Sequence, residues 1–567
     1  MAKSSYLKHI TGNETPQSEK AKDNQVKNLA GGYVFKIDDW GILNRVLILG
    51  NSGGTYYASE RSVALNHFDV VKRCLSCDYK RTIDTIVAIS DQGRAFKNYP
   101  AIFALAVCSV YGDKKARTYA NQMVPKVARY STDLFTYVAN VLSLKENKKG
   151  KGLQRSIGRW YTEKDVEKLS YQVCKYPKRS VEGHKIGHAD LLKIARICPK
   201  KGNNCARNSK SLTIPSEDHS LLLKYAINGL SSPDNEKGIS LDTFNGWKDN
   251  KKFQYIWAHE KAKNAKTKKD VIKLINDYKL TRESIPPEFI NEASVQKALL
   301  PHMPMTALIR NLGGMTSSGL LKPLSKEVDM VIEKISNEEA LQKARIHPMS
   351  IIMALKVYKS GKGIRTSWSP SQQILECLDD SFYKAFKYIE PTGKKYLLGI
   401  DVSGSMGWGT LYGGQNNVLT SAESAAVIAM CIARLEKKHL MMGFSHEFKD
   451  LGITKSDSLS TVLRKTSSHN FGSTDCALPM QYALENDLDV DIFVVLTDNE
   501  TWCGRVHPFQ ALKQYRKKKN KEAKLAVLAF EADNFSIADP SDSGMIDIVG
   551  LDSNVPIVLS EFAKGSI

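Results

Sequence analysis

Hydrophobic positions recur with helical spacing over the first two thirds of the chain. From about residue 63 to residue 386, apolar residues return every three or four positions, as in Ile102–Val110 and Val331–Ile335. This spacing places them on one face of a helix. Short polar or Gly/Pro breaks separate the segments, and no repeat of fixed period is visible. A long series of short helices favours an α-solenoid over a single bundle, and a solenoid curves around a surface that suits a large ligand.

Near residue 396 the pattern changes to alternating strands and helices. Apolar runs of strand length alternate with longer segments of helical pattern. The predicted strands are 396–402, 440–444, 492–497 and 525–530, and the predicted helices are 421–437, 477–485 and 508–519. This alternation predicts a doubly wound, mainly parallel sheet.

The 567 residues therefore divide into a tail and two folded parts. We expect a loose polar segment over 1–24, a helical domain over 25–393 and an α/β domain over 394–567. No apolar run approaches the roughly 20 residues of a membrane-spanning helix, and the first residues hold no apolar signal core. The ten cysteines are scattered. We expect reduced thiols in an intracellular protein, located in the cytoplasm and also in the nucleus.

The excess positive charge is confined to the helical part. Residues 394–567 hold 18 Lys and Arg against 21 Asp and Glu, which leaves 63 basic and 39 acidic residues in 1–393, a net charge of +24. A basic protein is often basic only for solubility, but so large an excess in one region favours a polyanionic partner. We therefore predict nucleic acid as the partner of the helical part.

Candidate metal chemistry lies at the ends of two predicted strands. Asp401, Ser403 and Ser405 form a D-x-S-x-S run after the first strand, and Asp498 follows the strand 492–497. Open α/β sheets bind ligands at this edge, and one carboxylate with two hydroxyls offers the hard oxygen ligands that suit Mg²⁺. A polar turn at 472–475 lies between them in the sequence. The alternative is a helix-capping cluster without a metal.

These three pieces together resemble the metal-ion-dependent adhesion site of von Willebrand factor A domains. The resemblance implies that Asp401, Ser403, Ser405, Thr474 and Asp498 hold Mg²⁺ or another divalent cation. In that family the residue at the position of Asp498 often acts through a water. The site leaves a position open, so the resemblance also implies an acidic protein ligand.

Longer segments resemble one family over nearly the whole chain. Residues 25–35, 49–57, 304–313 and 497–502, in this domain order, resemble the Ro ribonucleoprotein autoantigen family, whose module is called TROVE. The resemblance covers roughly residues 25–567. It implies a closed ring of HEAT-like helical repeats followed by a von Willebrand A domain. It also implies that the outer surface binds small non-coding Y RNAs and that the central hole admits single-stranded 3′ ends of misfolded RNAs.

The same resemblance implies RNA contacts by Lys175, Arg179 and His188. Lys and Arg suit phosphate, and His suits stacking on a base or donating a hydrogen bond. The segment between Arg179 and His188 is longer than the family pattern, so its register is open. The alternatives are a solvated helix end for the two cations and a structural role for His188.

Three classes of function compete. The first is a non-catalytic RNA-binding scaffold, a monomer acting in RNA quality control as a ribonucleoprotein. The second is a Mg²⁺-dependent RNA-processing enzyme, and the third is an adhesion-type protein-binding module. The chain has no G-x-x-x-x-G-K-[ST] loop, and the D-x-S-x-S run supplies one carboxylate where two-metal nucleases need several. An adhesion module alone leaves the +24 charge unexplained, so we predict the scaffold, without enzymatic activity.

Overall fold

The computed structural model describes residues 14–49, 60–95, 97–146, 149–181, 184–197, 214–363, 366–385, 390–407, 420–467, 472–531, 533–550 and 552–566. Within these ranges every helix is too short or too polar to cross a lipid bilayer.

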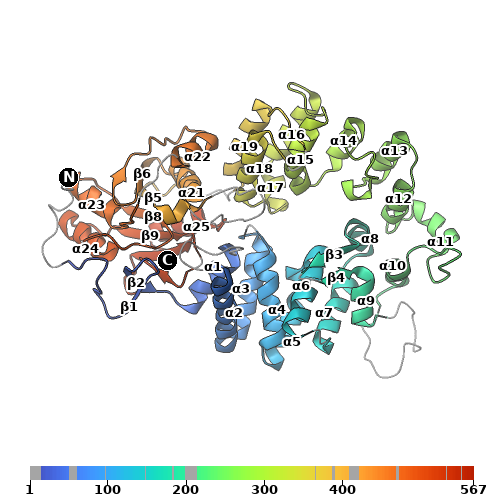
Figure 1. The fold of residues 1–567 in the computed structure, drawn as a ribbon, viewed down its shortest axis with the longest axis horizontal. Helices are drawn as coiled ribbons and strands as arrows, with labels where there is room; N and C mark the ends of the chain where they lie inside the picture. Colours follow the sequence, from blue (N-terminus) through green and yellow to red (C-terminus); the bar gives the residue numbers. More distant parts are fainter. Residues whose placement is uncertain are drawn as a thin grey trace.

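The first part is a long series of short helices. They are α1 (Asp39–Leu49), α2 (Glu60–Cys77), α3 (Tyr79–Gln92), α4 (Tyr99–Tyr111), α5 (Lys114–Val127), α6 (Ser131–Leu144), α7 (Lys151–Thr162), α8 (Val166–Lys175), α9 (His188–Ala195), α10 (Glu217–Asn228), α11 (Leu241–Gly246), α12 (Gln254–Lys263), α13 (Lys268–Tyr278), α14 (Ala293–Leu299), α15 (Met305–Ser317), α16 (Lys326–Ser336), α17 (Glu338–Lys343), α18 (Pro348–Ser360) and α19 (Gln372–Lys384). Figure 1 shows them leaving the α/β domain through α1–α9, turning at α10–α12 and returning through α13–α19. The predicted solenoid is confirmed.

Local capping explains why the helices are short. Asp78 precedes α3 and its side chain accepts from the backbone N–H of Arg81 at 2.9 Å, while Gly93 ends the same helix in the left-handed region at φ 67°. Asp113 caps α5 in the same way. Each cap satisfies backbone donors that a helix start leaves free, so the chain can turn without a large cost.

The two arms of the helical series meet, which closes a ring. Arg345, after α17, lies 2.9 Å from Asp91 of α3. The ring N–H of His347 donates to the carbonyl of Arg94 at 3.2 Å. Farther along the arms, the rings of Tyr171 and Tyr255 are in edge contact, which joins α8 to α12.

The second part is a six-stranded sheet covered by helices. Its strands are β5 (Lys395–Asp401), β6 (Lys438–Phe444), β7 (Phe448–Lys449), β8 (Ile492–Thr497), β9 (Lys524–Ala529) and β11 (Met545–Val549), in the order β11-β9-β8-β5-β6-β7. All neighbours are parallel except β6 and β7. Its helices are α20 (Gly404–Gly407), α21 (Ser421–Leu435), α22 (Leu459–Ser467), α23 (Leu478–Glu485), α24 (Pro508–Lys519) and α25 (Val555–Lys564). The predicted doubly wound sheet is confirmed.

Successive side chains of a strand point to opposite faces of the sheet and pack into two different cores. On β8, Val494 and Leu496 pack with α21 into a core that is continuous with the helical part. Phe493 and Val495 pack on the opposite face with α23 and α24. Both faces of a parallel strand are therefore buried, which is why its sequence reads as a continuous apolar run. The α/β domain also contacts both arms, through Asp552 to Arg94 and through Glu423 to Lys356.

Two expectations need correction. The segment 1–24 is not a loose tail in its described portion, 14–24, because Gln17 is fully buried against the α/β domain. Its continuation forms β1 (Gln25–Lys27) and β2 (Tyr33–Lys36), and β2 pairs with β10 (Phe535–Ser536). The nearly unbroken helical pattern is also interrupted by a hairpin, β3 (Lys178–Val181) with β4 (His184–Gly187). Most of the 49–57 signature, from residue 50 on, lies outside the described residues.

Candidate functional site

The predicted metal-site residues gather at the carboxyl edge of the sheet. Asp401 ends β5, Ser403 and Ser405 follow in the turn that opens α20, and Asp498 follows β8. β5 lies between β6 and β8, so the strand order changes direction here, where doubly wound sheets bind their ligands. Thr474 lies in the segment before α23. All five residues are at most 5% exposed.

Hydrogen bonds fix Asp401 and the two serines. Asp401 Oδ1 accepts from the backbone N–H of Ser403 at 2.9 Å, and its Oδ2 accepts from the Thr497 hydroxyl at 2.6 Å. The hydroxyl oxygens of Ser403 and Ser405 lie 3.2 Å apart. The Ser405 side chain lies near Asp498 and lowers the pKa of its carboxyl, against the larger effect of burial. The fold thus brings four of the five predicted residues into one cluster of oxygen atoms.

Thr474 is held next to this cluster by its backbone. Its carbonyl accepts from the backbone N–H groups of Trp502 at 3.1 Å and Cys503 at 3.3 Å. The loop that carries Thr474 therefore packs against the loop that follows Asp498. Asn499, in that second loop, has a φ of 65°, a left-handed conformation that is costly for most side chains but tolerated by Asn.

The electrostatics of the cluster fit a hard cation. Burial raises the pKa of both Asp401 and Asp498, and the neighbouring Asp498 carboxylate raises that of Asp401 further. Asp498 Oδ2 is buried and has no hydrogen-bond partner among the described residues. A divalent cation would offset the repulsion and use the free oxygen, and carboxylate with hydroxyl oxygens suits Mg²⁺. Within the described ranges, no three or more His, Cys, Asp or Glu side chains are grouped as metal ligands.

The N-terminal segment, residues 14–36, holds the loops around this cluster. The Gln17 side-chain amide donates to Asp475 Oδ1 at 2.7 Å and to the carbonyl of Val506 at 2.8 Å, and its oxygen accepts from the Thr501 hydroxyl. The Ala30 backbone N–H donates to Glu500 Oε2 at 2.8 Å. These contacts reach the residues that directly follow Thr474 and Asp498.

Gly32 allows this close packing. A β-carbon at Gly32 would overlap the Thr501 carbonyl, so a larger residue there would push the two segments apart. Sequence reasoning missed Gln17 and Gly32, because neither carries a local signal and both act through residues more than 450 positions away. It also missed the role of Thr497, although a hydroxyl directly before Asp498 was a visible signal.

The RNA contact by His188 stays a prediction, and the structure places this residue in the core of the helical part. His188 is 2% exposed and its ring packs against Phe135, Trp160 and Tyr161. Its Nδ1 shares a hydrogen bond of 2.6 Å with the Tyr161 hydroxyl. Burial lowers the pKa of His188 to about 4, so the ring is neutral near pH 7. This enclosure favours the structural role of His188 over the RNA contact.

Lys175 and Arg179 have different surroundings. The Lys175 side chain is only 12% exposed, and its ammonium donates to the Tyr171 hydroxyl at 2.8 Å and lies 4.0 Å from Glu283. Arg179 is exposed on β3, beside the exposed Lys178. Across the hairpin, the exposed Lys185 lies on β4. The outward cations of this region are therefore those of the hairpin, and Lys175 belongs to the interior of the helical part.

A basic and aromatic hollow lies between α8 and α12. The α8–α12 hollow has a volume of about 650 Å³ and lies between α8, α12 and the end of α13. Its cations are Arg129, Lys164, Lys168, Lys251 and Lys279, its tyrosines are Tyr171, Tyr255 and Tyr278, and its carboxylates are Asp165, Glu167 and Asp277. Burial and the charge of Lys168 lower the pKa of Lys164, and burial and the charge of Arg345 lower that of Arg129. The lowered pKa values mean that the positive charges of these side chains are destabilised here, and a bound anion would stabilise them.

Known proteins match the chain over nearly its full length. The sequence matches the TROVE domain family over residues 26–360 and the Ro60 vWA domain family over residues 395–563. It is 34% identical to the RNA-binding protein RO60 of Deinococcus radiodurans, covering 99% of each chain. It is 32% identical to the RNA-binding protein RO60 of Caenorhabditis elegans, covering 97% of this chain and 92% of that protein. The crystal structure of the Deinococcus radiodurans RO (RSR) protein superposes with a TM-score of 0.66 at 33% identity, covering 94% of this chain and 100% of that one.

Proposed function

The chain belongs to the Ro family of TROVE-domain proteins, and from that premise we propose that it is a non-catalytic RNA-binding scaffold. The relatives' names describe RNA-binding proteins. The charge of +24 on residues 1–393 supports the same function here. We further propose that its RNAs are small non-coding RNAs of the Y type and the single-stranded 3′ ends of misfolded non-coding RNAs, and that it acts in RNA quality control.

The α8–α12 hollow is the observation that carries the proposal. Lysines such as Lys168 and Lys279 can contact phosphates, and tyrosines such as Tyr255 can stack on bases. Single-stranded RNA exposes both groups, whereas the bases of a double helix are stacked inside it. The hollow therefore suits an unpaired RNA end better than a duplex.

Structured RNA needs a different surface. The exposed hairpin cations Lys178, Arg179 and Lys185 project from β3 and β4 and can follow the phosphates of a folded RNA. We assign the small structured RNA to this surface and the single-stranded end to the hollow. The two sites use different side chains, so variants can separate them.

The metal cluster has a separate role in this proposal. Ser403 and Ser405 offer neutral hydroxyls, so a Mg²⁺ held with Asp401 and Asp498 would have its charge offset by these two carboxylates alone and would keep a position for an acidic protein ligand. Unpartnered Asp498 Oδ2 supports this adhesion-type role as a second function. A bound Mg²⁺ would supply Lewis acidity, but among the residues that the structure describes no three or more His, Cys, Asp or Glu side chains are grouped as metal ligands, whereas two-metal RNA cleavage needs several carboxylates.

The test uses the full-length chain with two RNAs. One is a small structured RNA with a blunt end, and the other is the same RNA with a single-stranded 3′ tail. We expect both to bind in a mobility-shift assay, the tailed RNA more tightly, and both to remain intact after incubation with Mg²⁺. Failure to bind either RNA would contradict the scaffold. Cleavage that requires Mg²⁺ and is lost in Asp401→Asn would favour an RNA-processing enzyme.

A further inference from the structure

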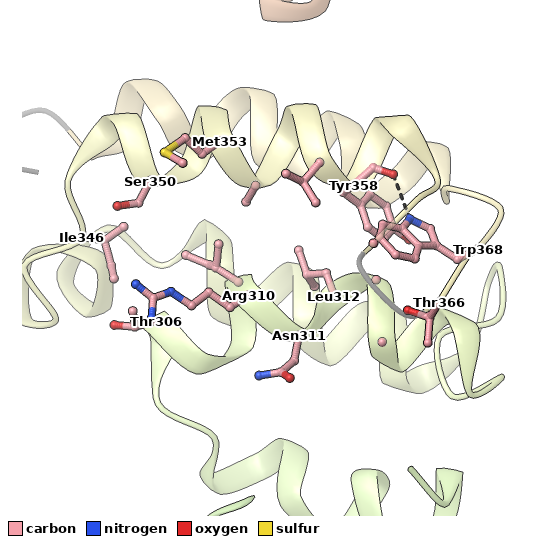
Figure 2. A pocket seen from close by; sticks show the side chains of 16 residues that line it. Thr306, Arg310, Asn311, Leu312, Ile346, Ser350, Met353, Tyr358, Thr366 and Trp368 are labelled. Atoms are coloured by element: carbon pink, nitrogen blue, oxygen red, sulfur yellow. Dashed lines mark hydrogen bonds between the residues drawn. The ribbon is translucent and has the colours of Figure 1, made fainter. Parts of the chain in front are cut away.

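A second cavity, of about 430 Å³, lies between α15 and α18 (Figure 2). Its wall is mainly apolar and aromatic and includes Leu312, Met353, Tyr358 and Trp368, and Arg310 lies at its edge. We propose that this cavity binds an unpaired base of single-stranded RNA while Arg310 contacts a neighbouring phosphate. The inference rests on the proposed RNA binding and adds a base-binding subsite to it.

The aromatic end of the cavity is rigid. The indole N–H of Trp368 donates to the carbonyl of Tyr358 at 2.8 Å, and the two rings are stacked with centroids 6.1 Å apart. Gly313 lies under the indole, and a β-carbon there would overlap the ring. A wall that is already ordered loses little side-chain entropy when a flat ligand binds. Base–aromatic contact of this kind tolerates any base.

Arg310 supplies the charge at the other end. Figure 2 shows Arg310 beside Thr306 and Ile346, at the end of the cavity away from Trp368. Arg310 is exposed, and within the described ranges no carboxylate or other acceptor pairs with it. By contrast, Lys356 of α18 is neutralised by Glu423 at 2.8 Å. A guanidinium next to an apolar cavity matches a nucleotide, which joins an apolar base to a phosphate.

The cavity adjoins a small hollow at the end of α8, with which it shares Asn311. Tyr171 lines the α8–α12 hollow, and Lys175, one turn later on α8, lines this small hollow with Arg282 and His302. A single strand with one base in the cavity would therefore have Lys175 and Arg282 in the adjoining hollow. This arrangement favours a base over a protein side chain as the occupant, because an apolar peptide gains nothing from these cations.

Gly314 provides a way to fill the cavity. It lines the cavity, and a β-carbon there would meet no atom within 4 Å, so Gly314→Leu extends into open space. The matched control is Gly246→Leu, because Gly246 lies on α11, outside the cavity lining, and its β-carbon position is equally open. Arg310→Gln removes the charge, and Arg155→Gln removes an exposed arginine of α7 as its control.

The experiment measures binding of a 4-thiouridine-containing single-stranded oligouridylate to the full-length chain, with inorganic polyphosphate as a base-free competitor. We expect Gly314→Leu to lower the affinity for the oligonucleotide about fivefold or more. Its affinity for polyphosphate, measured by competition, should equal that of the wild type. Arg310→Gln should lower the affinities for the oligonucleotide and for polyphosphate more than Arg155→Gln does. Equal affinities of Gly314→Leu and Gly246→Leu would overturn the inference and leave the cavity to a protein ligand.

A second readout needs no variant. Ultraviolet crosslinking of the same oligonucleotide to the wild-type chain should yield adducts in α15, α18 or Trp368, and adducts confined to other segments would overturn the inference. This readout decides if Gly314→Leu melts below its control and cannot be assayed. If the wild type binds no single-stranded RNA at all, the proposed function itself fails. If it binds but neither readout involves the cavity, only the subsite fails.

Discussion

The Gln17 side-chain amide donates to Asp475 Oδ1 at 2.7 Å, although the two residues are 458 positions apart in the sequence. Asp475 directly follows Thr474, so the first described residues help to place a residue of the predicted metal site. The α/β domain is therefore completed by the beginning of the chain. A fragment that starts at residue 394 would lack Gln17, β1 and β2.

Replacing Gln17 should disturb the predicted metal site, because Gln17 holds the loops that carry it. Gln17→Ala removes one hydrogen bond each from the buried Asp475 carboxylate and the Thr501 hydroxyl, and leaves a cavity where the amide was. We expect a loss of about 2–4 kcal/mol in the free energy of unfolding. We also expect a weaker divalent-ion dependence of the melting temperature. Gln372→Ala, at an exposed helix position, is the control and should change neither quantity. An unchanged Mg²⁺ response in a destabilised Gln17→Ala chain would show that Gln17 does not position the cluster.

Removing one charge from the cluster should separate stability from metal binding. Asp401→Asn relieves the repulsion between two buried carboxylates, so the metal-free variant should melt at or above the wild-type temperature. Added Mg²⁺ should raise the melting temperature of the wild type but not that of the variant. RNA affinity should stay within about twofold, because the basic surfaces lie in the helical part. A Mg²⁺ shift that persists in Asp401→Asn would contradict the assignment of the site.

The hairpin should bind structured RNA through its exposed cations. Replacing Lys178, Arg179 and Lys185 by Gln should weaken binding of a small structured RNA roughly tenfold or more and leave the melting temperature within about 2 °C. By contrast, His188→Gln should lower the melting temperature and leave the affinity for the small structured RNA unchanged, because this residue is buried in the core. Titrations of RNA and thermal melts of both variants check this. Equal RNA affinity in the hairpin variant would remove the hairpin from the RNA surface.

The buried His188 predicts a loss of stability in acid. Its pKa is about 4 in the fold and near 6.5 in the unfolded chain, so the unfolded chain takes up the proton first. The stabilisation is complete above pH 6.5 and falls as the pH drops toward 4, by roughly 3 kcal/mol for this residue. His259 is buried with a similarly lowered pKa and adds to the trend. Denaturant unfolding at several pH values should show this slope, and His188→Gln should flatten it. An equal slope in both chains would contradict the burial argument.

Sequence patterns predicted the parts of the fold that local rules control. The predicted strand 492–497 has the bounds of β8, and the helix predicted at 508–519 has those of α24, because periodicity and flanking polar residues are local signals. The same rules placed Asp401 and Asp498 at one sheet edge. They could not find Gln17, whose partners are distant in sequence, or the hairpin after α8, whose four-residue strands are too short to show alternation. They also could not show that His188 is buried, because histidine occurs in cores and on surfaces and only packing decides its place.

The central claim is that RNA binds to the cations of the helical ring. The most direct measurement is the salt dependence of single-stranded RNA affinity in the full-length chain. It compares the wild type with a variant in which the hollow residues Lys168, Lys251 and Lys279 are replaced by Gln. The control replaces the exposed Lys437, Lys513 and Lys517 of the near-neutral α/β domain. We predict a steep loss of affinity with salt in the wild type and in the control. In the hollow variant, the slope of log affinity against log salt should be smaller by about 2, since each lost phosphate contact removes about 0.7. The same slope and affinity in all three chains would contradict the account.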